Sequence, residues 1–223
     1  IRVRTDEGVP WPELEEAMGG IPAVFEKGVR LPAGFGGHVV DGESLRRRLL
    51  LNGALRVLEE AAREGEIGEV ALLDREGRWG HLLPRLMQVC RTVTVVTGQE
   101  GLYRRLSEQL YQTLGAAPVL AERAGGLSHC RALLAPEGLS GFGAVEKPPL
   151  LFSPDGREGL TLTEEGVPSP FPPALTEKYD LFALLTAFRG ERLFRDAPRL
   201  IPSAFREGGR AVSLAEAVAR FSP

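Results

Sequence analysis

The stretch that most constrains the fold covers residues 70–97, whose pattern predicts a strand, a loop with two glycines, a helix and a second strand. Residues 70–73 are wholly apolar and end at Asp74, as in a strand buried on both faces of a parallel sheet. Residues 93–97 are rich in β-branched side chains, which favour a second strand. Because parallel strands need a crossover of about a dozen or more residues, the loop and helix between them predict a βαβ unit.

Further strands and helices are expected on both sides of this unit. A long helix is predicted over residues 44–64, with Ser44 as its N-cap, and another over residues 102–114. Two shorter apolar runs, at 118–121 and 131–135, predict a third and a fourth strand. Strands that alternate with helices in this order predict an α/β protein with a three-layer, Rossmann-like and mostly parallel sheet.

The rest of the chain is expected to finish the sheet and then add helices. Residues 150–152 and 160–163 flank a segment with an Asp-Gly pair, which predicts an antiparallel hairpin at one sheet edge. A helix is expected over residues 176–188, and a capping box beginning at Ser213 predicts a last one.

The domain organisation follows from these elements. We expect an N-terminal extended region with the long helix over residues 1–65, a Rossmann-like core over 66–165 and a C-terminal helical extension over 166–223. With 223 residues, the three parts are also compatible with one compact domain.

Composition excludes several classes of partner. A formal charge of -3 argues against a general affinity for nucleic acid or an anionic membrane. The chain holds no run of eighteen apolar residues, so no membrane span is expected. Cys90 and Cys130 lie in no ligand-type spacing, which favours buried thiols, no metal and a cytoplasmic location.

The loop after the first strand carries Gly77 and Gly80 at the spacing G-x-x-G. Glycines at such a place let backbone N–H groups and a helix N-terminus approach a pyrophosphate. The loop resembles part of the NAD(P)-binding fingerprint of Rossmann dehydrogenases: Gly77 and Gly80 match its second and third glycines, and Arg75 stands at the first. An arginine there restricts the tight turn, and it also offers a cation to the phosphates.

The end of the second strand departs from the same fingerprint. Thr97 stands where those dehydrogenases carry an acid that accepts from the ribose hydroxyls, and Arg104 and Arg105 follow on the next helix. A small polar residue followed by arginines resembles NADP-preferring enzymes. The resemblance therefore implies an oxidoreductase that binds NADP or NAD through Gly77, Gly80, Arg75, Thr97, Arg104 and Arg105, with its substrate and catalytic residues undefined.

Two other functional hypotheses fit the same residues. A Rossmann-like scaffold without catalysis, serving assembly or regulation, is favoured by Arg75 at the turn and by the missing acid at Thr97. The pattern Asp74-x-x-Gly77-x-x-Gly80 is also loosely similar to the first motif of Rossmann-like, S-adenosylmethionine-dependent methyltransferases, which ranks below the other two hypotheses.

Two further segments flank the predicted fourth strand. His129 and Cys130 precede the predicted fourth strand, and we interpret them as a loop histidine beside a core thiol because their spacing supplies no further ligand. The glycine-containing loop at 136–143 follows that strand. It should therefore lie near Gly77 and Gly80 at the carboxyl ends of the strands, where open α/β sheets bind ligands.

Overall fold

The computed structural model describes residues 10–143, 145, 150–156, 159–196 and 200–221. The chain divides into two compact units, one made of residues 1–45 and 169–196, and the other of residues 46–168 and 197–223. Every candidate residue named above belongs to the second unit.

A five-stranded parallel sheet forms the centre of the second unit. Its strands are β1 (Ile67–Leu73), β2 (Cys90–Val96), β3 (Val119–Ala121), β4 (Ala132–Leu134) and β5 (Leu150–Phe152), in the order β3-β2-β1-β4-β5. Val70 lies opposite Val93 in a parallel register, as the βαβ prediction requires. The predicted α/β fold class is confirmed, and the strand order reverses direction between β1 and β4.

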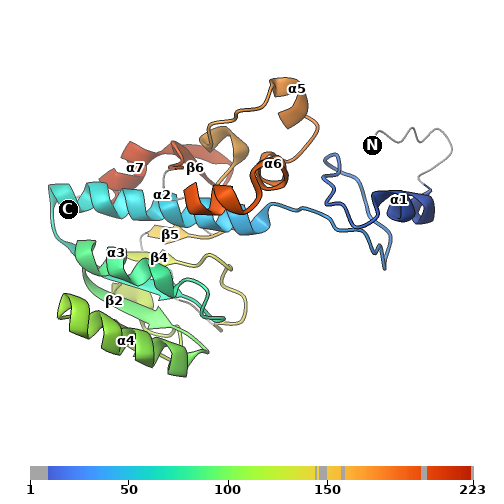
Figure 1. Cartoon of the computed structure of the whole chain (residues 1–223). Coiled ribbons are helices and arrows are strands. Elements are labelled where there is room, and N and C mark those ends of the chain that lie inside the picture. Colours follow the sequence, from blue (N-terminus) through green and yellow to red (C-terminus); the bar gives the residue numbers. More distant parts are fainter. Residues whose placement is uncertain (1–9, 144, 146–149, 157–158, 197–199, 222–223) are drawn as a thin grey trace. The chain divides into compact units, whose positions relative to one another are not determined.

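The helices of the chain include those predicted around the βαβ unit (Figure 1). They are α1 (Trp11–Met18), α2 (Glu43–Glu64), α3 (Leu83–Val89), α4 (Glu100–Leu114), α5 (Pro173–Thr176), α6 (Leu181–Asp196) and α7 (Leu214–Ala219). The crossover from β1 to β2 is a 3-10 turn, Gly80–Leu82, followed by α3. Pro84 stands in the first turn of α3, where its missing N–H costs no helical hydrogen bond.

One face of the sheet is covered without a crossover helix. Ala71, Leu73 and Leu133 are fully buried there, in a cluster that also holds Leu127 and Cys130. The connection from β3 to β4 contains only the 3-10 turn Leu127–His129. The side chains at the end of that turn therefore lie directly against the strands.

The antiparallel pair is formed by a different part of the chain from the one predicted. Residues 150–152 become β5, which runs parallel to β4, and the bridge between Phe152 and Leu160 is parallel too. The N–H of Leu160 donates to the carbonyl oxygen of Leu151, and the N–H of Ser153 donates to the carbonyl oxygen of Leu160. At this bridge the chain therefore runs in the same direction as β5. The two-stranded antiparallel sheet consists of β6 (Ala204–Glu207) and β7 (Arg210–Ser213).

The helix predicted over residues 176–188 begins five residues later than expected and continues to Asp196, and a separate short helix precedes it. α5 ends at Thr176 and α6 begins at Leu181. The Asp180 carboxylate accepts the N–H of Ala183 at 2.9 Å, the contact of an N-cap side chain, so a new helix begins at this point. The capping box at Ser213 is confirmed at the start of α7.

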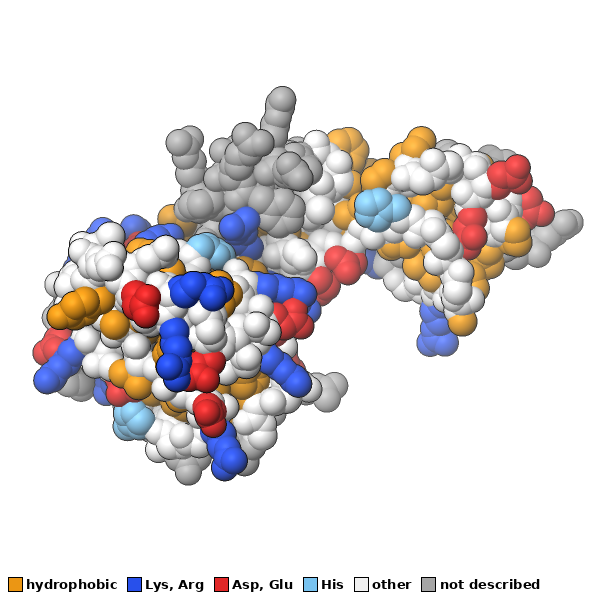
Figure 2. Space-filling view, turned by 60° about the horizontal axis from the view of Figure 1, so that its bottom comes forward, with side chains coloured by type: hydrophobic (Ala, Val, Ile, Leu, Met, Phe, Trp, Pro, Cys, Tyr) orange, Lys and Arg blue, Asp and Glu red, His pale blue; other side chains and the backbone are white. Residues whose placement is uncertain are grey.

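The described surface carries charges of both signs. On the face of the sheet-bearing unit turned toward the viewer in Figure 2, acidic and basic side chains are interspersed, with small hydrophobic groups between them. None of the described helices is both long and apolar enough to cross a bilayer.

Candidate functional site

The strand order defines where a ligand is expected. Open α/β sheets bind ligands beyond the carboxyl ends of the strands, at the point where the order reverses. Here that point lies between β1 and β4, so the loop over residues 74–79 and the loop over residues 135–143 flank it.

Asp74, the first residue after β1, is completely buried. One of its carboxylate oxygens accepts the N–H of Arg78 at 3.0 Å, and the other accepts the N–H of Trp79 at 2.7 Å. The second oxygen also accepts the hydroxyl proton of Tyr103 on α4. The N–H groups of Arg78 and Trp79 are therefore bound by a carboxylate of the protein itself.

Gly77 and Gly80 make room for α4. A Cβ on Gly77 would lie 2.7 Å from Leu102 Cδ2, and the positive φ of Gly77, 76°, also favours glycine. A Cβ on Gly80 would lie 2.8 Å from Leu106 Cδ2. Both glycines therefore allow close packing of the loop against side chains of α4.

Arg75, which is exposed, and Trp79, which is buried, belong to the same loop. The guanidinium of Arg75 lies against Gly141 in the loop that follows β4, in the space that a Cβ on Gly141 would occupy. Trp79 is 8% exposed, and its indole Nε1 is buried with no hydrogen-bond partner among the described residues. The side chain of Arg75 therefore contacts the loop that follows β4, and the indole of Trp79 is buried in the protein.

The remaining predicted residues make local contacts. The hydroxyl of Thr97, at the end of β2, accepts the N–H of Gln99 at 2.9 Å. Arg104 donates from Nε to Glu100 at 3.0 Å, one helical turn away, and its side chain is 70% exposed. Arg105 is exposed beside it on α4. The structure therefore gathers Arg75, Gly77 and Gly80 in one loop, whereas both arginines of α4 lie on its outer surface.

This arrangement leaves fewer free donors and less open space for a pyrophosphate beside Gly77 and Gly80. Such binding needs free N–H groups at the helix N-terminus and open space over the glycines. The N–H groups of Arg78 and Trp79 are bonded to Asp74, and the space over both glycines is filled by Leu102 and Leu106.

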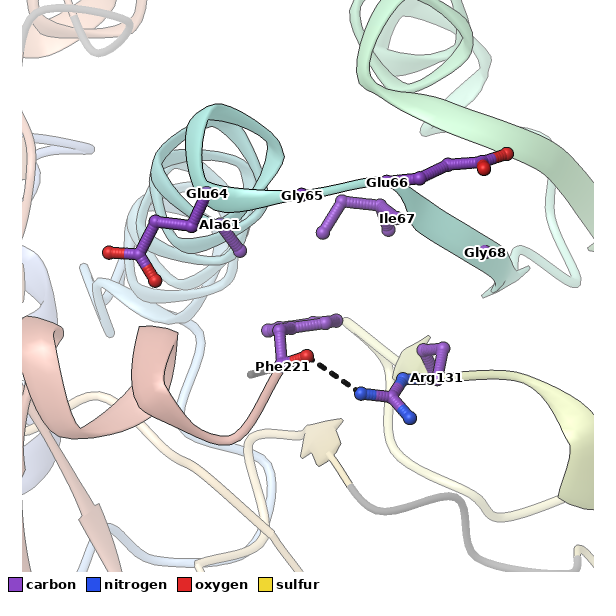
Figure 3. Close-up of a pocket in the computed structure, with 8 residues that line it drawn as sticks. All are labelled: Ala61, Glu64, Gly65, Glu66, Ile67, Gly68, Arg131 and Phe221. Carbon is purple, nitrogen blue, oxygen red and sulfur yellow. Dashed lines mark hydrogen bonds between the residues drawn. The ribbon is translucent and has the colours of Figure 1, made fainter. Parts of the chain in front are cut away.

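A pocket lies at the other end of the sheet, where β1 begins (Figure 3). Arg131 donates to the carbonyl oxygen of Phe221 at 2.8 Å across it. The pocket is lined by Ala61, Glu64, Gly65, Glu66, Ile67, Gly68, Arg131 and Phe221. No residue of this pocket was singled out from the sequence.

The same end of the sheet holds a cluster of possible metal ligands. Glu69, His129 and Cys130 each offer one ligand atom, and these atoms lie within 4.8 Å of one another. The sequence identified His129 and Cys130, and Cys130 is indeed a buried thiol. Glu69 was missed because it stands sixty residues earlier in the chain, and only the pairing of β1 with β4 brings it close.

The parallel sheet, the βαβ crossover and the reversal of strand order define an α/β protein of Rossmann-like architecture. Neither a family model, nor a curated protein, nor a solved structure matches the chain.

Proposed function

We propose that this chain is a Rossmann-like scaffold without catalysis, which serves assembly or regulation and whose crossover loop stabilises the fold instead of binding a dinucleotide. The observation that carries this proposal is the buried carboxylate of Asp74, which accepts the N–H groups of Arg78 and Trp79.

The physical argument concerns competition for the same donors. In dinucleotide-binding folds, the N–H groups at the start of the crossover helix bind the phosphate anion. Here an internal carboxylate binds two N–H groups of the loop that leads into the 3-10 turn, and the carboxylate is itself fixed by Tyr103. A phosphate would have to displace a fully buried anion, which would then lie unpaired in a dry environment at a cost of several kcal/mol.

A nucleotide titration tests this proposal. The chain has two tryptophans, so a Trp11→Phe background leaves Trp79 as the reporter beside the loop. We expect no saturable change in Trp79 fluorescence with NADPH, NADH or S-adenosylmethionine at millimolar concentration. Saturable quenching of Trp79 by any of these three ligands would contradict the scaffold.

A second candidate function is an NADP- or NAD-dependent oxidoreductase that holds its nucleotide by side chains. One observation favours it: the buried Nε1–H of Trp79 has no acceptor among the described residues, which leaves a donor for a ligand. Arg75 and the exposed Arg78 add positive charge near the point where the strand order reverses. A cytoplasmic location belongs to both proposals.

The second candidate makes a separate prediction for α4. If Arg104 and Arg105 contact a 2′-phosphate, replacing both with Ala should weaken NADPH binding at least tenfold and leave NADH binding unchanged. Because both side chains are exposed, the double variant should keep the fold, and circular dichroism checks this. Equal weakening of both nucleotides would remove the 2′-phosphate assignment.

A further inference from the structure

The cluster of Glu69, His129 and Cys130 joins two strands at the start of the sheet. Glu69 lies in β1, and the other two residues directly precede β4. The N–H of Arg131 donates to the carbonyl oxygen of Glu69 at 2.7 Å, so the backbone that carries Glu69 lies beside the backbone that follows Cys130. The cluster lies at the opposite end of β1 from Asp74 and is independent of the function proposed above.

The spacing between the nitrogen and oxygen donors suits a small tetrahedral cation, and the sulfur of Cys130 lies within 4.8 Å of both. His129 Nε2 and Glu69 Oε2 are 3.1 Å apart. Two light ligand atoms at tetrahedral zinc, each about 2.0 Å from the ion, lie about 3.3 Å apart. Little movement is therefore needed for both atoms to bind one ion.

The carboxylate of Glu69 is already oriented by a neighbour. The hydroxyl of Thr94, on β2, donates to Glu69 Oε1 at 2.5 Å. This bond occupies one oxygen and leaves Oε2, the oxygen nearer His129, for a ligand role. Outer contacts of this kind orient the ligands of protein metal sites.

We propose that Glu69, His129 and Cys130 form a transition-metal site whose expected ion is Zn²⁺. One sulfur, one imidazole nitrogen and one carboxylate oxygen are a donor set that zinc accepts, and hard ions such as Mg²⁺ disfavour it. Three protein ligands leave a fourth position open, and the 59% exposure of the His129 side chain gives solvent access to it.

The same contacts argue against a nucleophilic cysteine. Burial, followed by the charge and hydrogen bond of Glu69, raises the pKa of Cys130 to about 12. Activated thiols instead have cationic neighbours that lower their pKa. A bound cation reverses this balance, because the thiol proton is released to solvent as the sulfur becomes a ligand.

Cobalt binding provides the test, because a Co²⁺–thiolate bond has a charge-transfer absorption band that reports the sulfur directly. The full-length chain is reduced, stripped with a chelator and titrated with Co²⁺, and Zn²⁺ is then added. We expect one Co²⁺ per chain, with a band that Zn²⁺ abolishes. Thr94→Val should weaken binding by about 10–100-fold.

The variants provide matched controls. Cys130→Ser should abolish the charge-transfer band, and His129→Ala, which alters an exposed side chain, should weaken binding at least tenfold without affecting the fold. Cys90→Ser is the control, because Cys90 is also a buried free thiol and lies outside the cluster. No thiolate band in the unaltered chain, or a band unchanged in both ligand variants, would overturn the proposal.

Discussion

The contact between Tyr103 and Asp74 is a buried polar interaction between α4 and the loop after β1. Both residues are completely buried, and the Tyr103 hydroxyl donates to the carboxylate. Burial, followed by the bond to Asp74 and its charge, raises the pKa of Tyr103 far above its ordinary value. The hydroxyl therefore keeps its proton and remains a donor throughout the ordinary pH range.

Removing this hydroxyl should destabilise the fold. A hydrogen bond to a charged group contributes about 1.5–3 kcal/mol, so we expect Tyr103→Phe to lower the free energy of unfolding by an amount in this range. Urea denaturation measures the difference. Tyr111→Phe is the matched control on the same helix: Tyr111 is 65% exposed, and its change should stay within about 0.5 kcal/mol. Equal effects of the two substitutions would show that the buried contact contributes nothing.

At the scale of elements, the segment β6-β7-α7 is held together by contacts close in sequence. The Ser213 hydroxyl accepts the N–H of Glu216, whose carboxylate in turn accepts the N–H of Ser213. Arg220, just after α7, donates through two nitrogens to the two carboxylate oxygens of Glu207, at 3.0 and 2.6 Å. This two-point contact links the end of β6 to the end of α7.

The pair of Glu207 and Arg220 should make stability depend on pH. The hydrogen bond from Arg220 lowers the pKa of Glu207 in the folded chain, so its contribution is present above the usual glutamate pKa and is lost as the pH falls through the lower, folded value. Because the Glu207 side chain is 40% exposed, we expect Glu207→Gln to cost less than about 1 kcal/mol at neutral pH.

Urea denaturation at several pH values measures this contribution. The difference between the unaltered chain and Glu207→Gln should shrink toward zero as the solution is acidified from neutral pH to about pH 3. Glu122→Gln, at an exposed position on another loop, should show no such difference at any pH. A difference that grows on acidification would contradict the lowered pKa of Glu207 in the folded chain.

Some elements could be predicted from the sequence because their cause is local. The apolar run at 70–73 is the buried part of β1, and the Ser213 capping box begins α7. The edge hairpin was placed wrongly because an Asp-Gly pair favours a turn and does not determine the direction in which the chain returns.

The candidate sites were harder to predict because their partners are distant in sequence. The G-x-x-G spacing of Gly77 and Gly80 suggested a phosphate, whereas Leu102 and Leu106 occupy the space over the glycines. Asp74 lies 29 residues from Tyr103 in sequence, so no local pattern indicates that they meet. Only the packing of α4 against the loop brings these side chains together.

At the scale of the whole molecule, the sheet-bearing unit is assembled from two separate stretches, residues 46–168 and 197–223. Phe205 on β6 connects them. Its ring packs edge-on against Phe152 of β5 with centroids 5.5 Å apart. On α2, a Cβ at Gly53 would lie 2.7 Å from the same ring, so this glycine permits the close approach. One side chain of the second stretch thus contacts two elements of the first.

Truncation of Phe205 should therefore weaken the whole unit and not the small sheet alone. Phe205 is 1% exposed, and Phe→Ala at a buried position costs about 3–5 kcal/mol. We expect Phe205→Ala to lower the free energy of unfolding of the unit by that amount, as measured by urea denaturation followed by Trp79 fluorescence in the Trp11→Phe background. Tyr111→Ala, which truncates an exposed aromatic side chain, should change this free energy little.

Amide hydrogen exchange would reveal independent folding of the two stretches. In that case Trp79 would report an unchanged transition while β6 and β7 lost their protection from exchange. A common loss of both signals is expected, because the Phe205 ring is shared between the small sheet, β5 and α2.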